Sequence, residues 1–455
     1  MSLQSLLSPG IGSILVKGEP GTGKTILAFE LLRLHGRGVY VSTRVPEERA
    51  LNQYPGAKEL FLSGRLKLAK PEAKGTRFED VRLGTMPIAM ESILESISKM
   101  KQPLVVLDSW DTISKEVDPV ERMKAEKTLI ALAEANKARL VFISEDPKLT
   151  TTDWPVDAIV LLKDDILEGR RIRRIEWRKL RGVDILWEAT LFTLYGARFN
   201  LLQGRSVSEF DNQVEFKPYR ATKNTAKHYS TGSQDLDVML GGGLRKGSVN
   251  VLELGPYLDP LWHQPLVVAI SCNFVSNGGA YVSVPVTGVT PEMIKAARLR
   301  YLPKQLVEGR VRIADYAGSS QKDPCIFKLD TSSPANSLET FAHVTEEIAT
   351  DGGQRRPVLT TIGIDAVEMV IGNSFPRYYA RGTAMMGSHG DTSILLARHS
   401  TLSRDVLVDM ADVYLKADII DGSVILVSLK PPTRSYSISY DYGLGYPSVR
   451  LTPIA

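Results

Sequence analysis

The chain has 455 residues, of which 43% are hydrophobic and 24% charged, so it is typical of a folded globular protein and excludes the disordered and fibrous classes. Its length exceeds what one hydrophobic core usually serves, and two or three domains are expected. The net charge of +4 is too small to argue for nucleic-acid binding. Cys272 and Cys325 have no CxxC spacing, which excludes a zinc knuckle and a disulfide framework. No apolar run approaches the roughly 20 residues that span a bilayer, and we expect a cytoplasmic protein.

The first predicted elements are a short strand at Ile14–Lys17, a glycine-rich loop and an apolar helix over 26–32. The loop fulfils GxxxxGK[ST] at every fixed position with Gly18, Glu19, Pro20, Gly21, Thr22, Gly23, Lys24 and Thr25. In such a loop backbone N–H groups surround the β-phosphate, the lysine reaches the β- and γ-oxygens, and the hydroxyl binds Mg²⁺. The segment from Gly18 to Ile26 is therefore predicted to bind a nucleoside triphosphate with Mg²⁺.

Two later strands of the first half end in polar residues. PLVVLDS ends its apolar run at Asp108, which we predict to hold Mg²⁺ through water. The alternative is a carboxylate that ends a strand without binding metal. ARLVFISED ends in Ser144 and Glu145, where a γ-phosphate sensor is expected, with an ordinary strand end as the alternative.

The most basic stretch of the chain is GRRIRRIEWRKLRG at 169–182. Lys179 and Arg181 are two residues apart on an expected strand, so their side chains project from one face. Three interpretations are open. The pair reaches the nucleotide of a neighbouring subunit, as arginine fingers do; it binds nucleic-acid phosphates; or it is a solvated surface.

The two halves of the chain repeat one another. Five markers recur in the same order: GS at 12 and 247, GVYVS at 38 and GAYVS at 279, GRLKLA at 64 and GRVRIA at 309, strands ending at Asp108 and Asp365, and strands ending at Lys179 and Lys430. Short β runs alternate with helical stretches such as 88–100 and 125–138, which favours parallel strands with helices on both faces. We predict an α/β protein of two tandem domains, 1–222 and 223–455.

The second domain lacks the chemistry of the first. GPYLDP at 255–260 stands where the glycine loop belongs, and no lysine follows until Lys295. Two prolines and bulky side chains prevent a ring of N–H donors, and Asp259 repels phosphate. We expect a copy kept for packing, partner binding or regulation, with a loop at 378–391 over the lost site.

GEPGTGKT, VVLDS, VYVST, KLRG and the leader STGSQDLDVMLGGGLRKGS at 230–248 together resemble the tandem-domain KaiC-like ATPases of the RecA superfamily. The resemblance covers the whole chain. It implies tandem RecA-like P-loop domains in a homo-oligomeric ring or filament. It also implies ATP and Mg²⁺ at subunit interfaces, with Lys179 and Arg181 contacting a neighbour's ATP.

One departure from the family concerns hydrolysis. After YVST the family has paired glutamates that activate water, whereas this chain has Arg44 and Val45, and the nearest carboxylates are Glu47 and Glu48. Because water activation needs a carboxylate within hydrogen-bond reach, we expect a regulatory protein with weak ATPase activity and Glu47 as the candidate base. The alternatives are a RecA/RadA-like DNA-binding protein that uses residues 170–181 and a scaffold that binds nucleotide without hydrolysing it.

Overall fold

The computed structural model describes residues 1–65, 75–80, 90–91, 93–95, 98, 100–114, 117–148, 155–202, 215–259, 261–316, 318, 323–351 and 353–454. Its contacts divide the chain into two units. The first is Met1–Gln203 with Asp421–Ser423 and Pro453–Ala455, and the second is Gly204–Ile420 with Val424–Thr452. The domain boundary between residues 222 and 223 stays a prediction. The marker at 64–69 and the expected helix at 88–100 lie largely outside the described residues.

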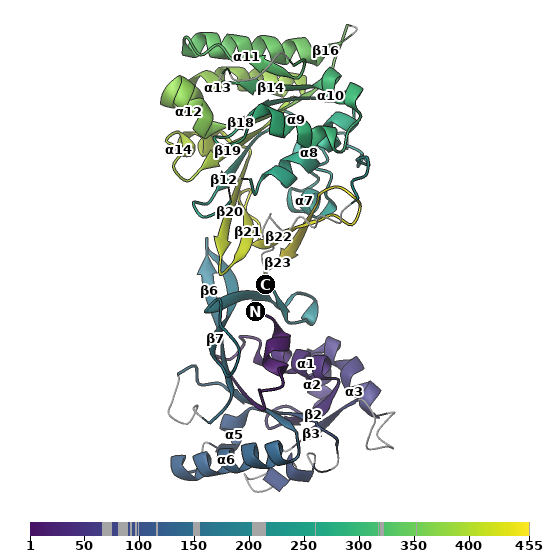
Figure 1. Ribbon diagram of the computed structural model, residues 1–455, viewed down its shortest axis with the longest axis vertical. Coiled ribbons are helices and arrows are strands. Elements are labelled where there is room, and N and C mark those ends of the chain that lie inside the picture. The colour runs from purple at the N-terminus through teal and green to yellow at the C-terminus, as the bar shows by residue number, and fades with distance from the viewer. Residues whose placement is uncertain are drawn as a thin grey trace. The chain divides into compact units, whose positions relative to one another are not determined.

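The first unit contains a sheet whose nine described strands follow the order β3-β2-β4-β5-β1-β6-β7-β8-β9 (Figure 1). Strands β3 to β6 of this order pair in parallel, and β7 to β9 are antiparallel. The strands are β1 (Ser13–Gly18), β2 (Arg37–Ser42), β3 (Gly75–Asp80), β4 (Leu104–Asp108), β5 (Arg139–Ser144), β6 (Ala158–Leu167), β7 (Arg170–Leu180), β8 (Ala189–Thr193) and β9 (Asn200–Leu201). The helices are α1 (Lys24–His35), α2 (Glu47–Gln53), α3 (Lys58–Arg65), α5 (Trp110–Ser114) and α6 (Pro119–Ala135). The predicted elements at 14–17, 26–32 and 104–108 are thereby confirmed.

Both faces of this sheet are covered. Along β4, Leu104 and Val106 belong to one buried cluster, and Val105 and Leu107 belong to another. Because successive side chains of a strand point to opposite faces, a continuous apolar run is what a strand buried on both sides requires. In such open α/β sheets ligands bind at the carboxyl ends of the strands.

The second unit repeats this topology. Its main sheet follows the order β15-β14-β13-β18-β19-β12-β20-β21-β22-β23, in which β14-β13-β18-β19-β12-β20-β21-β22 corresponds strand by strand to β3-β2-β4-β5-β1-β6-β7-β8. The strands are β12 (Val249–Leu254), β13 (Ala280–Val284), β14 (Val311–Asp315), β15 (Ile326–Lys328), β18 (Val358–Gly363), β19 (Thr392–Arg398), β20 (Val413–Ile420), β21 (Ser423–Lys430), β22 (Tyr436–Asp441) and β23 (Ser448–Pro453). The helices are α7 (Gln234–Met239), α8 (Gln264–Ser276), α9 (Pro291–Leu299), α10 (Lys304–Arg310), α11 (Pro334–Ala349), α12 (Ile364–Ile371), α13 (Phe375–His389) and α14 (Arg404–Met410). Two tandem α/β domains are thus confirmed.

The strand register corrects one of the repeat markers. Ser42 pairs with Asp108 in the first unit, and Ser283, at the matching place of GAYVS, pairs with Thr361 in the second. The counterpart of Asp108 is therefore Thr361 and not Asp365, which lies beyond the strand end in the first turn of α12. Because both runs are apolar and β-prone, sequence similarity alone left the alignment free to slip.

The expected loop at 378–391 was also wrong, because these residues belong mainly to helix α13. The helix has Pro376 in its first turn and ends at His389, and Gly390 just after it has a left-handed φ of 72°. Proline in a first turn and glycine just past the last turn are ordinary helix boundaries. The glycines at 382 and 387 suggested a loop, but they lie inside the helix.

Candidate nucleotide-binding site

The glycine-rich loop joins the carboxyl end of β1 to the N-terminus of α1. Gly18, Gly21 and Gly23 have φ values of 150°, 85° and 101°, which favour glycine. A Cβ on Gly18 would lie 2.6 Å from a backbone oxygen, and one on Gly23 would lie 2.9 Å from Leu194. The loop therefore needs glycine both for its backbone angles and for its close packing.

The lysine of the loop points back into it. Lys24 Nζ donates to the carbonyl oxygens of Gly18 at 2.8 Å and Glu19 at 2.7 Å. Burial lowers the pKa of Lys24, and the carboxylates of Glu145 and Asp108 oppose that shift. A buried ammonium with only two carbonyl partners can exchange them for phosphate oxygens, which are stronger acceptors.

Asp108 lies at the end of β4 and meets the loop. Its Oδ2 accepts hydrogen bonds from the Thr25 hydroxyl at 2.7 Å and from the Tyr40 hydroxyl at 2.5 Å. Burial raises the pKa of Asp108, while the two hydroxyl donors oppose that shift. Mg²⁺ prefers oxygen ligands and is usually held by one or two protein groups together with phosphates and water. The Thr25 and Asp108 oxygens fit such a site.

These groups line a cavity of about 530 Å³. Its wall also carries Arg44, which forms an ion pair with Glu145. The Glu145 backbone N–H donates to Asp111 at 2.5 Å, so the residue is anchored at the cavity edge. The arginine that stands in place of the expected glutamate thus neutralises a carboxylate that reaches the cavity from another strand.

The other predicted site residues are placed as follows. Ile26 and the loop residues Pro20, Gly21, Gly23, Lys24 and Thr25 line the cavity. Glu47 lies in the first turn of α2. The described residues of this helix that line the cavity are Arg49, Ala50 and Gln53. Ser144 is buried at the end of β5, and its hydroxyl accepts from the Asp146 N–H at 3.2 Å. Their roles stay predictions.

Two residues near the loop were missed from the sequence. Tyr40 holds Asp108, and its repetition as Tyr281 in GAYVS was a usable signal, since Tyr281 makes the same contact with Thr361 at 2.6 Å. Arg173 on β7 donates to the Gly21 carbonyl at 3.0 Å and to Asp164 at 3.0 Å. No sequence pattern links residues 152 positions apart, so this contact could not be read in advance.

Lys179 and Arg181 lie far from the loop of their own chain. Arg181 donates to Asp157 at 2.8 Å, and Asp157 accepts from the Ser13 hydroxyl at 3.1 Å, at the start of β1. Lys179 pairs with Ile159, which pairs with Leu15 near the same end. The loop follows the opposite end of β1, about 16 Å away at 3.3 Å per residue. The two cations are thus out of reach of a phosphate in their own cavity.

The basic stretch is largely paired with acidic groups. Arg171 and Arg173 contact Asp164, Arg174 contacts Asp165, Arg178 contacts Glu176, and Arg181 contacts Asp157. Free phosphate contacts need cations that are not already neutralised. This pairing weakens the DNA-binding alternative.

In the second unit the matching loop is filled by protein. Leu258 and Trp262 are buried in the main core cluster of the unit. A Cβ on Gly255 would lie 2.2 Å from the Asp418 carboxylate, so a negative charge lies where the loop begins. Arg298 is fully buried and donates to the Tyr281 hydroxyl at 3.0 Å. Apolar side chains and a carboxylate thus surround the segment that corresponds to the glycine-rich loop.

Comparisons with known proteins agree with this geometry. Residues 7–181 match a family model described as GvpD gas vesicle protein, P-loop domain. Protein GvpD2 of Halobacterium salinarum is 27% identical over 470 residues, which are 97% of this chain and 93% of that protein. Protein GvpD1 of the same organism is 25% identical with the same coverage. Circadian clock oscillator protein KaiC 1 of Synechocystis sp. is 26% identical over 258 residues, 52% of this chain and 46% of that protein. Among the described residues, no helix combines the length and apolar character needed to cross a membrane.

Proposed function

Because the chain is a KaiC-like P-loop protein of the RecA superfamily, we propose that it is a regulatory protein controlled by Mg²⁺-ATP bound in its N-terminal unit. The observation that carries the proposal is the convergence of Lys24, Thr25 and Asp108 on one cavity of about 530 Å³. Thr25 and Asp108 would hold Mg²⁺, which when bound supplies positive charge to the phosphates. The match of residues 7–181 to the GvpD gas vesicle family model, and the similarity to protein GvpD2 over 97% of this chain, support a role connected with gas vesicles.

We propose slow turnover. The Arg44–Glu145 ion pair neutralises a carboxylate at the cavity. Glu47, in the first turn of α2, stays the candidate base. A carboxylate that already accepts a hydrogen bond from an arginine has fewer free lone pairs with which to orient an attacking water. The N-terminal unit therefore keeps ATP unhydrolysed for long periods, which fits a regulatory protein better than an enzyme that uses rapid ATP hydrolysis to do work.

We propose that the second unit binds no nucleotide and that the subunits assemble with ATP at their interfaces. The Asp418 carboxylate and the buried Leu258 and Trp262 support the first point. The position of Arg181 at the sheet end away from its own loop supports the second, because this arginine is out of reach of a nucleotide in its own cavity. Contact in trans requires Arg181 to leave Asp157.

The test for binding is isothermal titration calorimetry with ATP and Mg²⁺. Thr25→Ala should lose Mg²⁺-dependent affinity, whereas Thr25→Ser, which keeps the hydroxyl, should bind like the parent protein. Lys24→Ala should abolish binding, and phosphate release should be slow and fall to background in that variant. No binding at millimolar ATP would refute the proposal, and binding without phosphate release would favour a non-hydrolysing scaffold.

The test for assembly is light scattering with and without Mg²⁺-ATP. We expect the mass to rise with nucleotide. Arg181→Ala and Lys24→Ala subunits should each be inactive alone, and mixing them should restore part of the activity because some interfaces then combine an intact loop with an intact arginine. Unchanged mass, or no restoration on mixing, would refute assembly through the nucleotide.

A further inference from the structure

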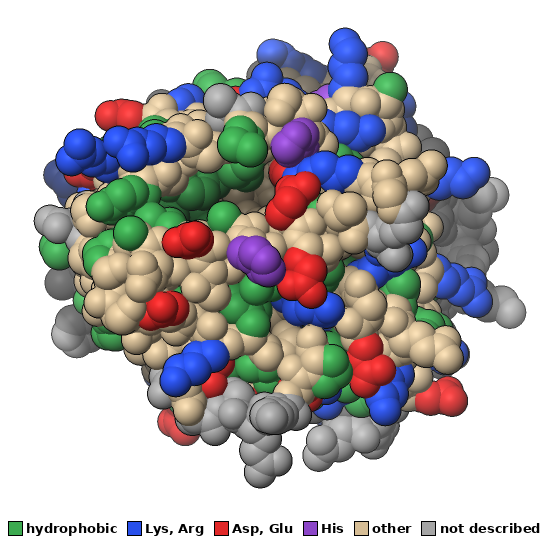
Figure 2. All heavy atoms as spheres, turned by 90° about the horizontal axis from the view of Figure 1, so that it is seen from above, with side chains coloured by type: hydrophobic (Ala, Val, Ile, Leu, Met, Phe, Trp, Pro, Cys, Tyr) green, Lys and Arg blue, Asp and Glu red, His purple; other side chains and the backbone are tan. Residues whose placement is uncertain are grey.

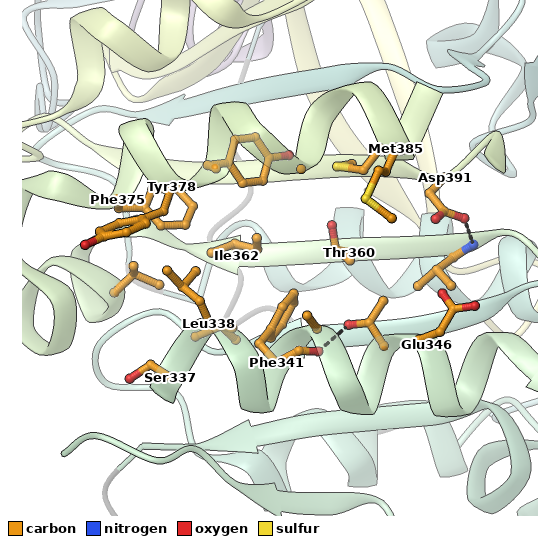
Figure 3. A pocket seen from close by; sticks show the side chains of 18 of the residues that line it. Ser337, Leu338, Phe341, Glu346, Thr360, Ile362, Phe375, Tyr378, Met385 and Asp391 are labelled. Atoms are coloured by element: carbon orange, nitrogen blue, oxygen red, sulfur yellow. Dashed lines mark hydrogen bonds between the residues drawn. The ribbon is translucent and has the colours of Figure 1, made fainter. Parts of the chain in front are cut away.

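The second unit contains a cleft of about 590 Å³ that no step above uses (Figure 3). Helices α11 and α13 form its walls and strand β18 forms its floor. The walls and floor are mainly apolar, with Leu338 and Phe341 from α11, Ile362 from β18, and Phe375 and Met385 from α13. Figure 2 looks onto this end of the unit and shows apolar side chains gathered in a hollowed part of the surface, among charged side chains of both signs.

One polar group lies on the floor. The Thr360 side chain is 6% exposed, and its hydroxyl has no hydrogen-bond partner among the residues that the structure describes. Figure 3 shows Thr360 in the middle of β18, facing the space between the helices. The next residue, Thr361, points to the other face and bonds to Tyr281 at 2.6 Å. A buried hydroxyl without a partner is unfavourable, and a ligand that bonds to it removes that penalty.

The charged groups at one end of the cleft are paired with one another, one arginine with two carboxylates. Arg355 forms two hydrogen bonds to Asp391, at 2.7 and 3.1 Å, and one to Glu346 at 3.3 Å. The opposite end is closed by Phe375, Tyr378 and Ser337 (Figure 3). A ligand therefore meets carboxylates and an arginine that are already ion-paired with one another at this end of the cleft, and aromatic side chains at the other.

We propose that this cleft binds a small neutral molecule that is mainly apolar and carries one hydroxyl or carbonyl group for Thr360. Small-molecule sites typically have volumes of about 300–1,000 Å³, apolar walls and a few polar groups that fix orientation. Methionine side chains at the lip adapt their shape readily to a ligand. A docked amphipathic helix fits less well, because its apolar face offers no partner to Thr360 and both ends of the cleft are bounded. The site is independent of the nucleotide cavity, since it uses other residues in the other unit.

The first experiment measures binding of the fluorescent probe N-phenyl-1-naphthylamine to the full chain. Ala342 is exposed on α11 and lines the cleft, whereas Ala335 is exposed on the same helix and does not line it. Ala342→Trp should fill the cleft and weaken probe binding at least about 10-fold, and Ala335→Trp should bind like the parent. Absence of probe binding, or equal binding by Ala342→Trp, would overturn the proposal. So would a dimer that Ala342→Trp dissociates, because a second copy would then cover the cleft.

The second experiment tests the role of the hydroxyl. 1-Naphthol and 1-methylnaphthalene each compete with the probe for the cleft. They are similar in size but only the first has a hydroxyl group, so the ratio of their affinities reports the hydrogen bond to Thr360. We expect this ratio to fall about 2- to 10-fold in Thr360→Val. Without ligand, Thr360→Val should raise the unfolding temperature and Thr361→Val should lower it, because only the second substitution removes a hydrogen bond. An unchanged ratio, or destabilisation by Thr360→Val, would overturn the assignment of Thr360.

Discussion

Arg173 offers the sharpest test of how the phosphate loop is held. Its guanidinium extends from β7 to the Gly21 carbonyl at 3.0 Å and to Asp164 at 3.0 Å, and the residue is only 8% exposed. Because Arg173 fixes the Gly21 carbonyl, the loop loses less conformational entropy when its N–H groups bind the phosphates. Arg173→Met keeps the buried stem and removes the donor.

The expected magnitude follows from this contact. A hydrogen bond from a charged donor contributes about 1.5–3 kcal/mol. Since the loop keeps its glycines and Lys24, we assign about half of that contribution to loop order. Half of it is about 0.75–1.5 kcal/mol, so at 1.4 kcal/mol per factor of ten Arg173→Met should weaken Mg²⁺-ATP binding about 3- to 12-fold. The stability of the fold should fall by about 1–3 kcal/mol as well, because Asp164 loses its buried partner.

Arg171 provides the matched control. It contacts the same carboxylate of Asp164 at 3.5 Å but is 63% exposed in its side chain and makes no described contact with the loop. Calorimetry should therefore find near-parental affinity in Arg171→Met. Equal losses in the two variants would mean that general charge, rather than the bond to Gly21, is responsible. An unchanged affinity in Arg173→Met would refute the reasoning outright.

Three further predictions concern the same cavity. Arg44→Ala should free Glu145 and raise the rate of phosphate release several-fold, as measured with a phosphate sensor; a lower rate would mean that Arg44 itself assists hydrolysis. Because burial raises the folded-state pKa of Asp108, the native chain keeps this proton at pH values where the unfolded chain has released it, so the stability contribution falls as the pH rises from the unfolded value to the folded one. Asp108→Asn has no carboxyl proton to lose, so its free energy of unfolding, measured by urea denaturation, should not show this fall between the two pKa values. The same substitution should weaken Mg²⁺-dependent ATP binding. A steeper pH dependence of stability in the variant would contradict the assignment. Gly23→Ala places a Cβ 2.9 Å from a leucine and should cost about 1–3 kcal/mol in thermal unfolding, more than Gly21→Ala, where nothing lies within 4 Å of the added carbon.

Local patterns were sufficient to predict much of the fold. A few neighbouring residues are enough to predict the strand before Asp108, the glycine-rich loop and the helix that follows this loop. The repeated markers predicted a second copy, and the matching strand order of the two sheets bears this out. Helix α13 was missed because its internal glycines are typical of loops, although apolar residues such as Phe375 and Tyr379 pack one side of it against the core.

The finer arrangement of the site could not be predicted from the sequence. The Arg44–Glu145 pair and the Arg173–Gly21 contact join residues that are 101 and 152 positions apart. Such pairs depend on which strands become neighbours, and that order is fixed by the packing of the whole sheet rather than by any local signal. Spacing pointed to the residues predicted to bind phosphate, but not to those that hold the predicted loop in place.

The two units show that the fold and the nucleotide chemistry depend on different residues. Tyr40 and Tyr281 lie on corresponding strands and each bonds to the residue paired with the following serine, which is Asp108 in one unit and Thr361 in the other. The tyrosine contact survives this exchange because a hydroxyl and a carboxylate both accept a hydrogen bond, but a neutral threonine is a far poorer magnesium ligand than a carboxylate. The second unit keeps the strand order although the loop lysine and this carboxylate are absent from it, so the fold does not depend on these two residues. The cleft of the second unit lies over β18, the strand that corresponds to β4 with Asp108 in the first unit, so the same position in the two sheets presents different surfaces.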